Sequence, residues 1–194
     1  RNRLLNLAQG EWVQYLDADD LLFPEKVERQ LAFARGHPEL DVVCSPTVLE
    51  RRVNGDFVCE ETHFPQAQDP WRMLASWDMP QTAGPLWKRT ALERVSGWKS
   101  DQPCCQEHEL YLRLLMSGTR FGFLDENLSL YRIWEMGTRL VERMQSQVPQ
   151  QRLLILQRME DFLRAQGQLT PDVRQAINDA RHRRRLGRRR SNGL

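Results

Sequence analysis

Long hydrophobic runs are missing from this sequence of 194 residues. Its longest uninterrupted apolar stretches, residues 31–34 and 153–156, reach only four residues, whereas a membrane-spanning helix needs about 20. We therefore expect no segment that crosses a bilayer. With 40% hydrophobic and 28% charged residues, the composition excludes a disordered or collagen-like chain and allows one globular domain with a core.

Cysteine is also scarce, and the four residues are Cys44, Cys59, Cys104 and Cys105. They lack the paired two-residue spacing of a zinc site and are too few for a disulfide scaffold. This pattern indicates a reducing cytosol. Cys104 and His108 would share one helix face, but two ligands do not complete a tetrahedral metal site.

Charge is unevenly distributed along the chain. The whole chain carries +2, yet seven arginines after residue 180 leave residues 1–180 with a net charge of −5. An acidic body argues against a specific nucleic-acid partner. The arginine-rich tail, residues 181–194, predicts at most a weak contact with anionic membranes. We therefore expect a cytoplasmic protein, or one peripheral to the membrane.

Helical and strand patterns alternate over the first two thirds of the sequence, which predicts an α/β fold. Helices are expected over residues 2–9, 24–35, 69–77, 90–96 and 104–117, and strands over residues 12–16, 41–49, 57–60, 84–87, 121–124 and 128–133. In the second helix, the spacing of Val27, Leu31 and Ala34 predicts the inward face. Thr90 and Glu93 have the spacing of a capping box.

After residue 137 the pattern becomes purely helical. One helix is predicted to be lined by apolar residues at helical spacing, and Thr170 is predicted to cap the last helix. The lining residues are Leu153, Leu156, Met159 and Leu163. We therefore expect three parts: an α/β part over residues 1–137, a helical extension over residues 138–180 and the tail over residues 181–194.

Asp17 and Asp19 follow a predicted strand directly, where α/β proteins commonly place their sites. Because one residue separates them, they can direct two carboxylates at one Mg²⁺ or Mn²⁺ ion, which completes its shell with substrate phosphates. The alternative is that Asp17, Asp19 and Asp20 only shape a turn and cap the next helix.

A second acidic pair opens the helix expected over residues 104–117. Glu109 precedes Arg113 by four residues, a pairing typical of an exposed helix face, so we expect Glu109 at the surface. Glu107 aligns with the apolar face, at the positive end of the helix dipole. A carboxylate in that position stays ionised and can act as a base. The alternative is a carboxylate that only stabilises the helix dipole.

Three segments in order resemble the inverting glycosyltransferases of family two, which have the GT-A fold. The stretch from Arg1-Asn2 to Leu16-Asp17-Ala18-Asp19-Asp20 looks like the one that ends in the family's DXD motif. Residues 87–98 and 106–114 are similar to the family's acceptor-side segment, whose acidic pair ends in the catalytic base. Three ordered motifs over about residues 1 to 133 are more specific than any one alone.

The resemblance implies transfer of a sugar from a nucleotide-diphosphate donor to a hydroxyl of a glycan, lipid or protein acceptor, with inversion. Asp17 and Asp19 would hold Mg²⁺ or Mn²⁺ and through it the donor, and Glu107 would be the catalytic base. The resemblance also implies that residues 1–137 are the C-terminal part of a GT-A domain. The first nucleotide-binding strands would be missing, so the chain would be a fragment of low stability.

Three positions depart from the family pattern. Leu4 stands where glycine is common, Glu107 where aspartate is usual, and Trp134 near the place of a histidine that helps hold the metal or diphosphate in many relatives. Tryptophan cannot coordinate a metal ion. The departures at Trp134 and Glu107 support a second hypothesis, a catalytically degenerate glycosyltransferase-like module that binds a nucleotide or glycan without turnover. Trp87 and Trp98 could form platforms for sugar rings, but we expect them in the core.

Overall fold

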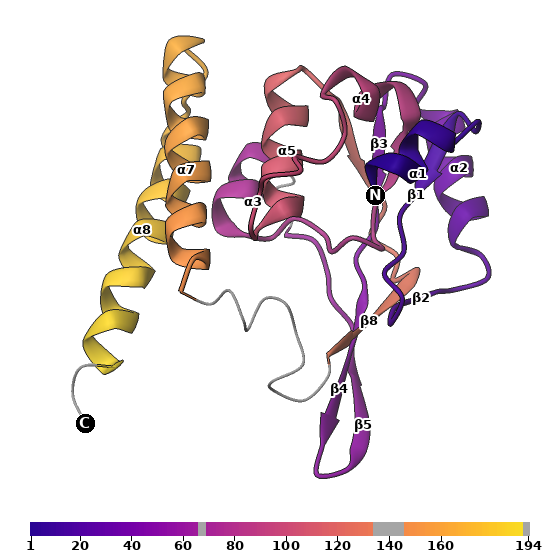
Figure 1. Cartoon of the computed structure of the whole chain (residues 1–194), viewed down its shortest axis with the longest axis horizontal. Helices are drawn as coiled ribbons and strands as arrows, with labels where there is room; N and C mark the ends of the chain where they lie inside the picture. Colours follow the sequence, from indigo (N-terminus) through magenta and orange to yellow (C-terminus); the bar gives the residue numbers. More distant parts are fainter. Residues whose placement is uncertain (66–68, 134–145, 192–194) are drawn as a thin grey trace.

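The computed structural model describes residues 1–65, 69–133 and 146–191. The chain forms two small mixed sheets, and helices pack against the first of them (Figure 1). A pair of long helices, α7 (Val148–Ala165) and α8 (Pro171–Ser191), stands along one side, next to α3 (Pro70–Ser76) and α5 (Gln106–Met116). The arrangement is the α/β class that the alternating sequence pattern predicts.

The first sheet has the strand order β1-β6-β3-β7. Its strands are β1 (Trp12–Gln14), β6 (Leu86–Lys88), β3 (Val42–Cys44) and β7 (Phe121–Phe123). β6 runs antiparallel to both β1 and β3, whereas β3 and β7 are parallel. All three residues of β3 are fully buried, as expected for an apolar strand that is covered on both faces.

The second sheet has the order β2-β8-β4-β5, formed by β2 (Leu21–Leu22), β8 (Ser129–Ile133), β4 (Val48–Val53) and β5 (Asp56–Glu60). β4 and β5 form a hairpin that projects from the body (Figure 1). Asn54 and Gly55 take φ values of 54° and 96° at its tip, and this dipeptide tolerates the positive φ angles of a tight hairpin turn. The strand expected over residues 41–49 is divided between the two sheets, with Pro46, which has no N–H to donate, at the break.

Two predictions about helices are wrong. In α2 (Lys26–Gly36) the inward face is Lys26, Gln30 and Ala34, while Val27 is 42% exposed. The polar pair is buried because its side chains find hydrogen-bond acceptors on neighbouring strands and loops. In α4 (Arg89–Arg94) the cap position is Lys88, without a side-chain hydrogen bond, so the capping box does not form. The chain's first helix, α1 (Asn2–Leu7), matches its expected place.

The C-terminal helices pack into the same core as α3 and α5. The shared cluster includes Leu156 and Met159 of α7 and Val173 and Ile177 of α8. Thr170 accepts a hydrogen bond from Val173 N at 3.3 Å, which confirms the predicted cap. Residues 137 and 138 lie outside the described residues, and the division of the chain into three parts stays a prediction.

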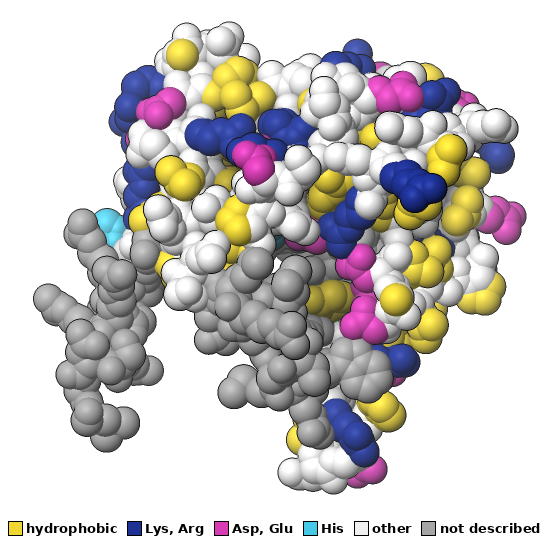
Figure 2. Space-filling model, viewed as in Figure 1, with side chains coloured by type: hydrophobic (Ala, Val, Ile, Leu, Met, Phe, Trp, Pro, Cys, Tyr) yellow, Lys and Arg dark blue, Asp and Glu magenta, His cyan; other side chains and the backbone are white. Residues whose placement is uncertain are grey.

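The molecular surface carries charges of both signs. On the face shown in Figure 2, basic and acidic side chains are interspersed with hydrophobic ones. Within the described ranges no helix combines the length and the apolar character that crossing a membrane requires.

The four cysteines are free thiols. Trp87 and Trp98 are 1% and 7% exposed, and both lie in the core as expected.

Candidate active site

The acidic loop connects β1 to β2, and its three aspartates have different surroundings. A backbone hydrogen bond of 3.1 Å from Asp20 N to Asp17 O closes the turn. Asp20 is buried and accepts a hydrogen bond from Arg132 N of β8 at 3.2 Å. Asp17 is half-buried and Asp19 is exposed. Asp20 therefore has the turn-shaping role, and none of the three caps α2, whose cap position is Glu25.

Arg1 joins this loop to the helix that carries Glu107. Its Nη2 donates to both carboxylate oxygens of Asp17, at 2.8 and 3.1 Å, and its Nη1 donates to Glu107 Oε1 at 3.2 Å. Burial alone would lower the pKa of Arg1, but the contacts with Asp17 and Glu107 raise it above its ordinary value. One guanidinium thus brings together two of the three residues that the sequence singled out.

The Arg1 side chain rests on Trp98, with its guanidinium carbon 4.2 Å from the ring centroid. Asn2 fixes Trp98 by a reciprocal pair of hydrogen bonds: Asn2 Nδ2 donates to Trp98 O at 2.7 Å, and Trp98 N donates to Asn2 Oδ1 at 2.8 Å. Gly97 has φ +63°, and a Cβ there would lie 2.7 Å from Asn2 Oδ1. Only glycine fits this close approach.

Glu107 lies in the first turn of α5 with 27% of its side chain exposed. Thr82 Oγ1 donates to Glu107 Oε1 at 3.0 Å, so Thr82 and Arg1 contact the same oxygen atom. Asp19 lies two positions after Asp17 in the acidic loop. Its charge acts on Arg132: the pKa of Arg132 is raised mainly by the hydrogen bond with Glu50 and, more weakly, by Asp19 and Asp20.

The prediction that Glu109 is at the surface is wrong. Glu109 is 1% exposed and pairs with Arg113 at 2.8 Å and with Arg158 at 3.1 Å. The i, i+4 pair with Arg113 forms as expected, but α7 covers it and supplies Arg158. Arg113 also donates to Gly97 O at 2.7 Å. Glu109 therefore supports the backbone next to Trp98 from inside the molecule.

The donor chemistry for a metal ion is present in part. Over the described part of the chain, no three His, Cys, Asp or Glu side chains gather as a metal site would require. Asp17 and Asp19 offer two carboxylates on one turn, which suits a Mg²⁺ or Mn²⁺ ion that takes its other ligands from phosphates and water. Arg1 donates to both oxygens of Asp17, so a metal ion would compete with it for this carboxylate. Trp134 lies outside the described residues.

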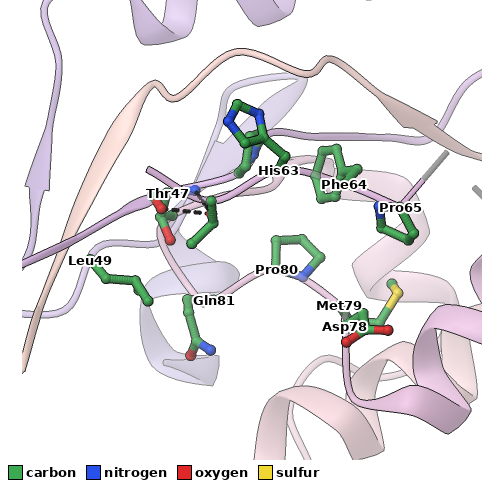
Figure 3. A pocket seen from close by; sticks show the side chains of 11 residues that line it. Thr47, Leu49, His63, Phe64, Pro65, Asp78, Met79, Pro80 and Gln81 are labelled. Atoms are coloured by element: carbon green, nitrogen blue, oxygen red, sulfur yellow. Dashed lines mark hydrogen bonds between the residues drawn. The ribbon is translucent and has the colours of Figure 1, made fainter. Parts of the chain in front are cut away.

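A pocket of about 450 Å³ adjoins the segment that contains Thr82, the hydrogen-bond partner of Glu107 (Figure 3). Thr62 Oγ1 donates to Thr47 O at 2.7 Å and accepts from Thr47 N at 3.1 Å, which fixes one wall. Gln81 lines the pocket and directly precedes Thr82, so this wall continues to the Thr82–Glu107 hydrogen bond. The other lining residues mix apolar and polar side chains, among them Leu49, His63, Phe64, Asp78 and Pro80.

The mixed sheets with an acidic loop after an edge strand define the class as GT-A-like α/β proteins, and two solved structures share the fold. S. aureus TarS 1-349 superposes with a TM-score of 0.53 at 17% identity, covering 80% of this chain and 43% of that chain. Mannosyltransferase PcManGT from Pyrobaculum calidifontis, in complex with GDP-Man and Mn²⁺, gives 0.54 at 17% identity, covering 93% and 51%.

Sequence comparison gives the particular family. Residues 1–83 match the family model of Glycosyl transferase family 2. The uncharacterized glycosyltransferase MJ1057 of Methanocaldococcus jannaschii is 24% identical over 139 residues, which cover 69% of this chain and 46% of that protein. The chain thus spans about half the length of the relatives it matches. The family resemblance is confirmed, and the absence of the first nucleotide-binding strands stays a prediction.

Proposed function

We propose that this chain takes part in transferring a sugar from a nucleoside-diphosphate donor to an acceptor hydroxyl, with inversion and with a divalent metal ion. One observation carries the proposal: the Arg1 guanidinium contacts Asp17 of the acidic loop at 2.8 Å and Glu107 at 3.2 Å. A donor-type loop and a base-type carboxylate therefore share one site. The match of residues 1–83 to the family model, and the GDP-Man and Mn²⁺ bound to PcManGT, support this function.

The donor end of the site consists of Asp17, Asp19 and Arg1. Asp17 and Asp19 would hold Mg²⁺ or Mn²⁺, which when bound offsets the negative charge that develops on the departing diphosphate. Arg1, once displaced from Asp17, presents a planar set of N–H donors that matches phosphate oxygens. The guanidinium thus exchanges one anionic partner for another.

Glu107 is the base in this proposal. As the acceptor oxygen forms its bond to the anomeric carbon and the bond to the diphosphate breaks, Glu107 takes the hydroxyl proton. Arg1 and Thr82 both donate to Oε1, so we assign the proton transfer to Oε2. The single displacement inverts the anomeric carbon, and a diphosphate leaving group needs no general acid.

The pocket in Figure 3 suits the acceptor. Phe64 and Pro80 offer apolar surface, while His63, Asp78 and Gln81 offer polar groups. This combination fits a ring that has hydroxyl groups on its edge and C–H groups on its faces. The acceptor hydroxyl belongs to a glycan, a lipid or a protein.

Replacing the base tests the proposal. We expect Glu107→Gln to lower sugar transfer about 10²- to 10⁴-fold, the usual contribution of a general base, with the donor still bound. The matched control is Glu93→Gln, since Glu93 forms a surface ion pair with Arg89 on the preceding turn of α4. Transfer by Glu107→Gln at the wild-type rate would contradict the role of Glu107.

A second candidate function is binding without turnover. The observation that favours it is that Arg1 pairs with both Asp17 and Glu107, so Arg1 competes with a metal ion for Asp17 and engages one oxygen of Glu107. Calorimetric titration with nucleoside diphosphates, run beside a transfer assay, separates the two functions. Binding with no transfer from any donor of the panel would favour the binding module.

A further inference from the structure

Lys26 is fully buried at the start of α2. Its Nζ donates to Gly84 O at 2.9 Å and to Gln30 Oε1. Burial lowers the pKa of Lys26 to about 7, partly offset by Cys44 of β3, the titratable group that faces it. Burying a lysine is unfavourable compared with an apolar side chain of the same size, so its presence requires a reason.

The target of Lys26 is one carbonyl oxygen that four donors surround. Gly84 O also accepts from Gln30 Nε2 at 2.9 Å, from Ser45 Oγ at 3.1 Å and from Ser45 N at 3.3 Å. A Cβ on Gly84 would lie 2.6 Å from Ser45 O and 2.8 Å from Pro80 Cβ. The backbone at Gly84 is therefore held in a fixed position by hydrogen bonds and by close packing.

Gly84 ends the turn that carries the hydrogen-bond partner of Glu107. Gly84 N donates to Gln81 O at 2.9 Å, and this turn contains Thr82, which is 5% exposed. At the other end, Tyr111 Oη of α5 donates to Pro80 O at 2.9 Å. With both ends fixed, the Thr82 hydroxyl is directed at Glu107 Oε1 at 3.0 Å.

We propose that Lys26 is a positioning residue for Glu107 and acts through Gly84 and Thr82. The inference rests on the proposed role of Glu107 as the base. Lys26 fixes Gly84, the turn presents Thr82, and Thr82 orients the carboxylate so that Oε2 faces the acceptor hydroxyl.

A double-mutant cycle tests this path in the full chain. Thr82→Val removes the hydroxyl with little change of shape, and Lys26→Met removes the amine. We expect each to lower kcat roughly tenfold or more, as small displacements of reacting groups do, with KM for the donor unchanged. We expect the double variant to be no slower than the slower single variant, because both act on one contact. Multiplicative effects would overturn the proposal.

Lys88→Met is the matched control. Lys88 Nζ also donates to backbone carbonyls, those of Pro38 and Leu40, but contacts nothing in the Pro80–Gly84 turn. We expect its kcat to stay within about twofold of wild type, since the site geometry is untouched. If Lys26→Met does not fold, Ser45→Ala removes a milder donor from the same Gly84 oxygen and should show the same non-additivity with Thr82→Val.

A readout without turnover separates this proposal from the proposed function. In protein labelled with ¹³C-glutamate, the carboxyl resonance of Glu107 should shift in Thr82→Val and in Lys26→Met, and stay in place in Lys88→Met. An unchanged resonance in Lys26→Met would overturn the positioning role even if the enzyme is active. If the resonance shifts but the protein transfers no sugar, Lys26 still positions Glu107 through Gly84 and Thr82, and the proposed role of Glu107 as the catalytic base is wrong.

Discussion

At the scale of single residues, Arg1 is the positive charge that lies between two carboxylates of the site. It pairs with Asp17 and Glu107 and lies over the Trp98 ring. Because a metal ion and this guanidinium compete for the same two oxygens of Asp17, Arg1 opposes metal binding in the absence of a donor. With a donor present, its N–H groups have phosphate oxygens as new acceptors.

Removing Arg1 should therefore strengthen metal binding by the free protein. We expect Arg1→Gln to bind Mn²⁺ several-fold more tightly without nucleotide, because a partly exposed ion pair contributes about 0.2–1 kcal/mol. Binding of a nucleoside diphosphate should weaken in the same variant. Electron paramagnetic resonance of free Mn²⁺ measures the first effect. Arg29→Gln, which breaks a surface pair with Glu126, is the control, and unchanged Mn²⁺ affinity in Arg1→Gln would contradict the competition.

Lys26 should make stability depend on pH. Its pKa is about 7 in the folded protein and 10.5 for an ordinary lysine, so between these values the unfolded chain binds more protons. Stability therefore rises with pH from 7 to about 10, with a slope of at most about 1.4 kcal/mol per pH unit. Below pH 7 the lysine is charged in both states and its full cost remains.

Urea unfolding at pH 7 and pH 9.5 measures this effect against Lys26→Met, which lacks the titrating amine. Relative to Lys26→Met, the wild-type protein should have a larger free energy of unfolding at pH 9.5 than at pH 7. A difference that stays constant would show that Lys26 is charged throughout this range.

The residue types at the site were predictable from the sequence, but their contacts were not. Asp17, Asp19 and Glu107 stand out because each lies in a local motif that can be recognised in the sequence. The role of Arg1 stayed hidden because its partner Glu107 is 106 positions away, and no local pattern reports such a pair. Thr82 and Lys26 carry no motif at all, and their importance comes only from packing around Gly84.

At the scale of elements, the packing of α7 on α5 buries a pair of charged residues whose spacing predicts an exposed position. Glu109 and Arg113 have the spacing of a surface pair, yet α7 covers them and adds Arg158. The sequence placed the helices well, because apolar periodicity is local. The burial of Glu109 and the inward face of α2 could not be predicted from the sequence, because both depend on which element packs against them.

The two arginines around Glu109 should differ in their effect on stability. Arg113 has a side-chain exposure of 20% and Arg158 one of 42%, and Arg113 also holds the Gly97 carbonyl. We expect Arg113→Met to destabilise the protein by about 3 kcal/mol, since it leaves a buried carboxylate without its main partner, and Arg158→Met by about 1 kcal/mol or less. Urea unfolding checks the order, and equal losses would contradict it.

At the scale of the whole molecule, the C-terminal helices are part of the core. Ile155, Leu156, Met159 and Leu163 are 0–2% exposed and belong to the same cluster as Leu110 of α5. The alternating pattern predicted the α/β class, while the division of the strands into two sheets did not follow from it. Strand pairing is non-local, and the break at Pro46 has no signature that separates it from a kink within one strand.

Removing α7 and α8 should unfold the remainder. We expect a chain that ends at residue 146 to lose its cooperative thermal transition, because the apolar faces of α3 and α5 would then be exposed to water. Differential scanning calorimetry against the full chain measures this. A cooperative transition near that of the full chain would show that residues 1–146 form an independent unit.

The most direct test of the site is calorimetric titration with a panel of nucleoside diphosphates, in the presence of Mn²⁺ and then of a chelator, on the wild-type chain and on Asp17→Asn. If Asp17, Asp19 and Arg1 form the donor end, one nucleotide binds only with Mn²⁺, and Asp17→Asn loses that binding. Binding that is the same with chelator, or unchanged in Asp17→Asn, would contradict a metal-dependent donor site at this loop.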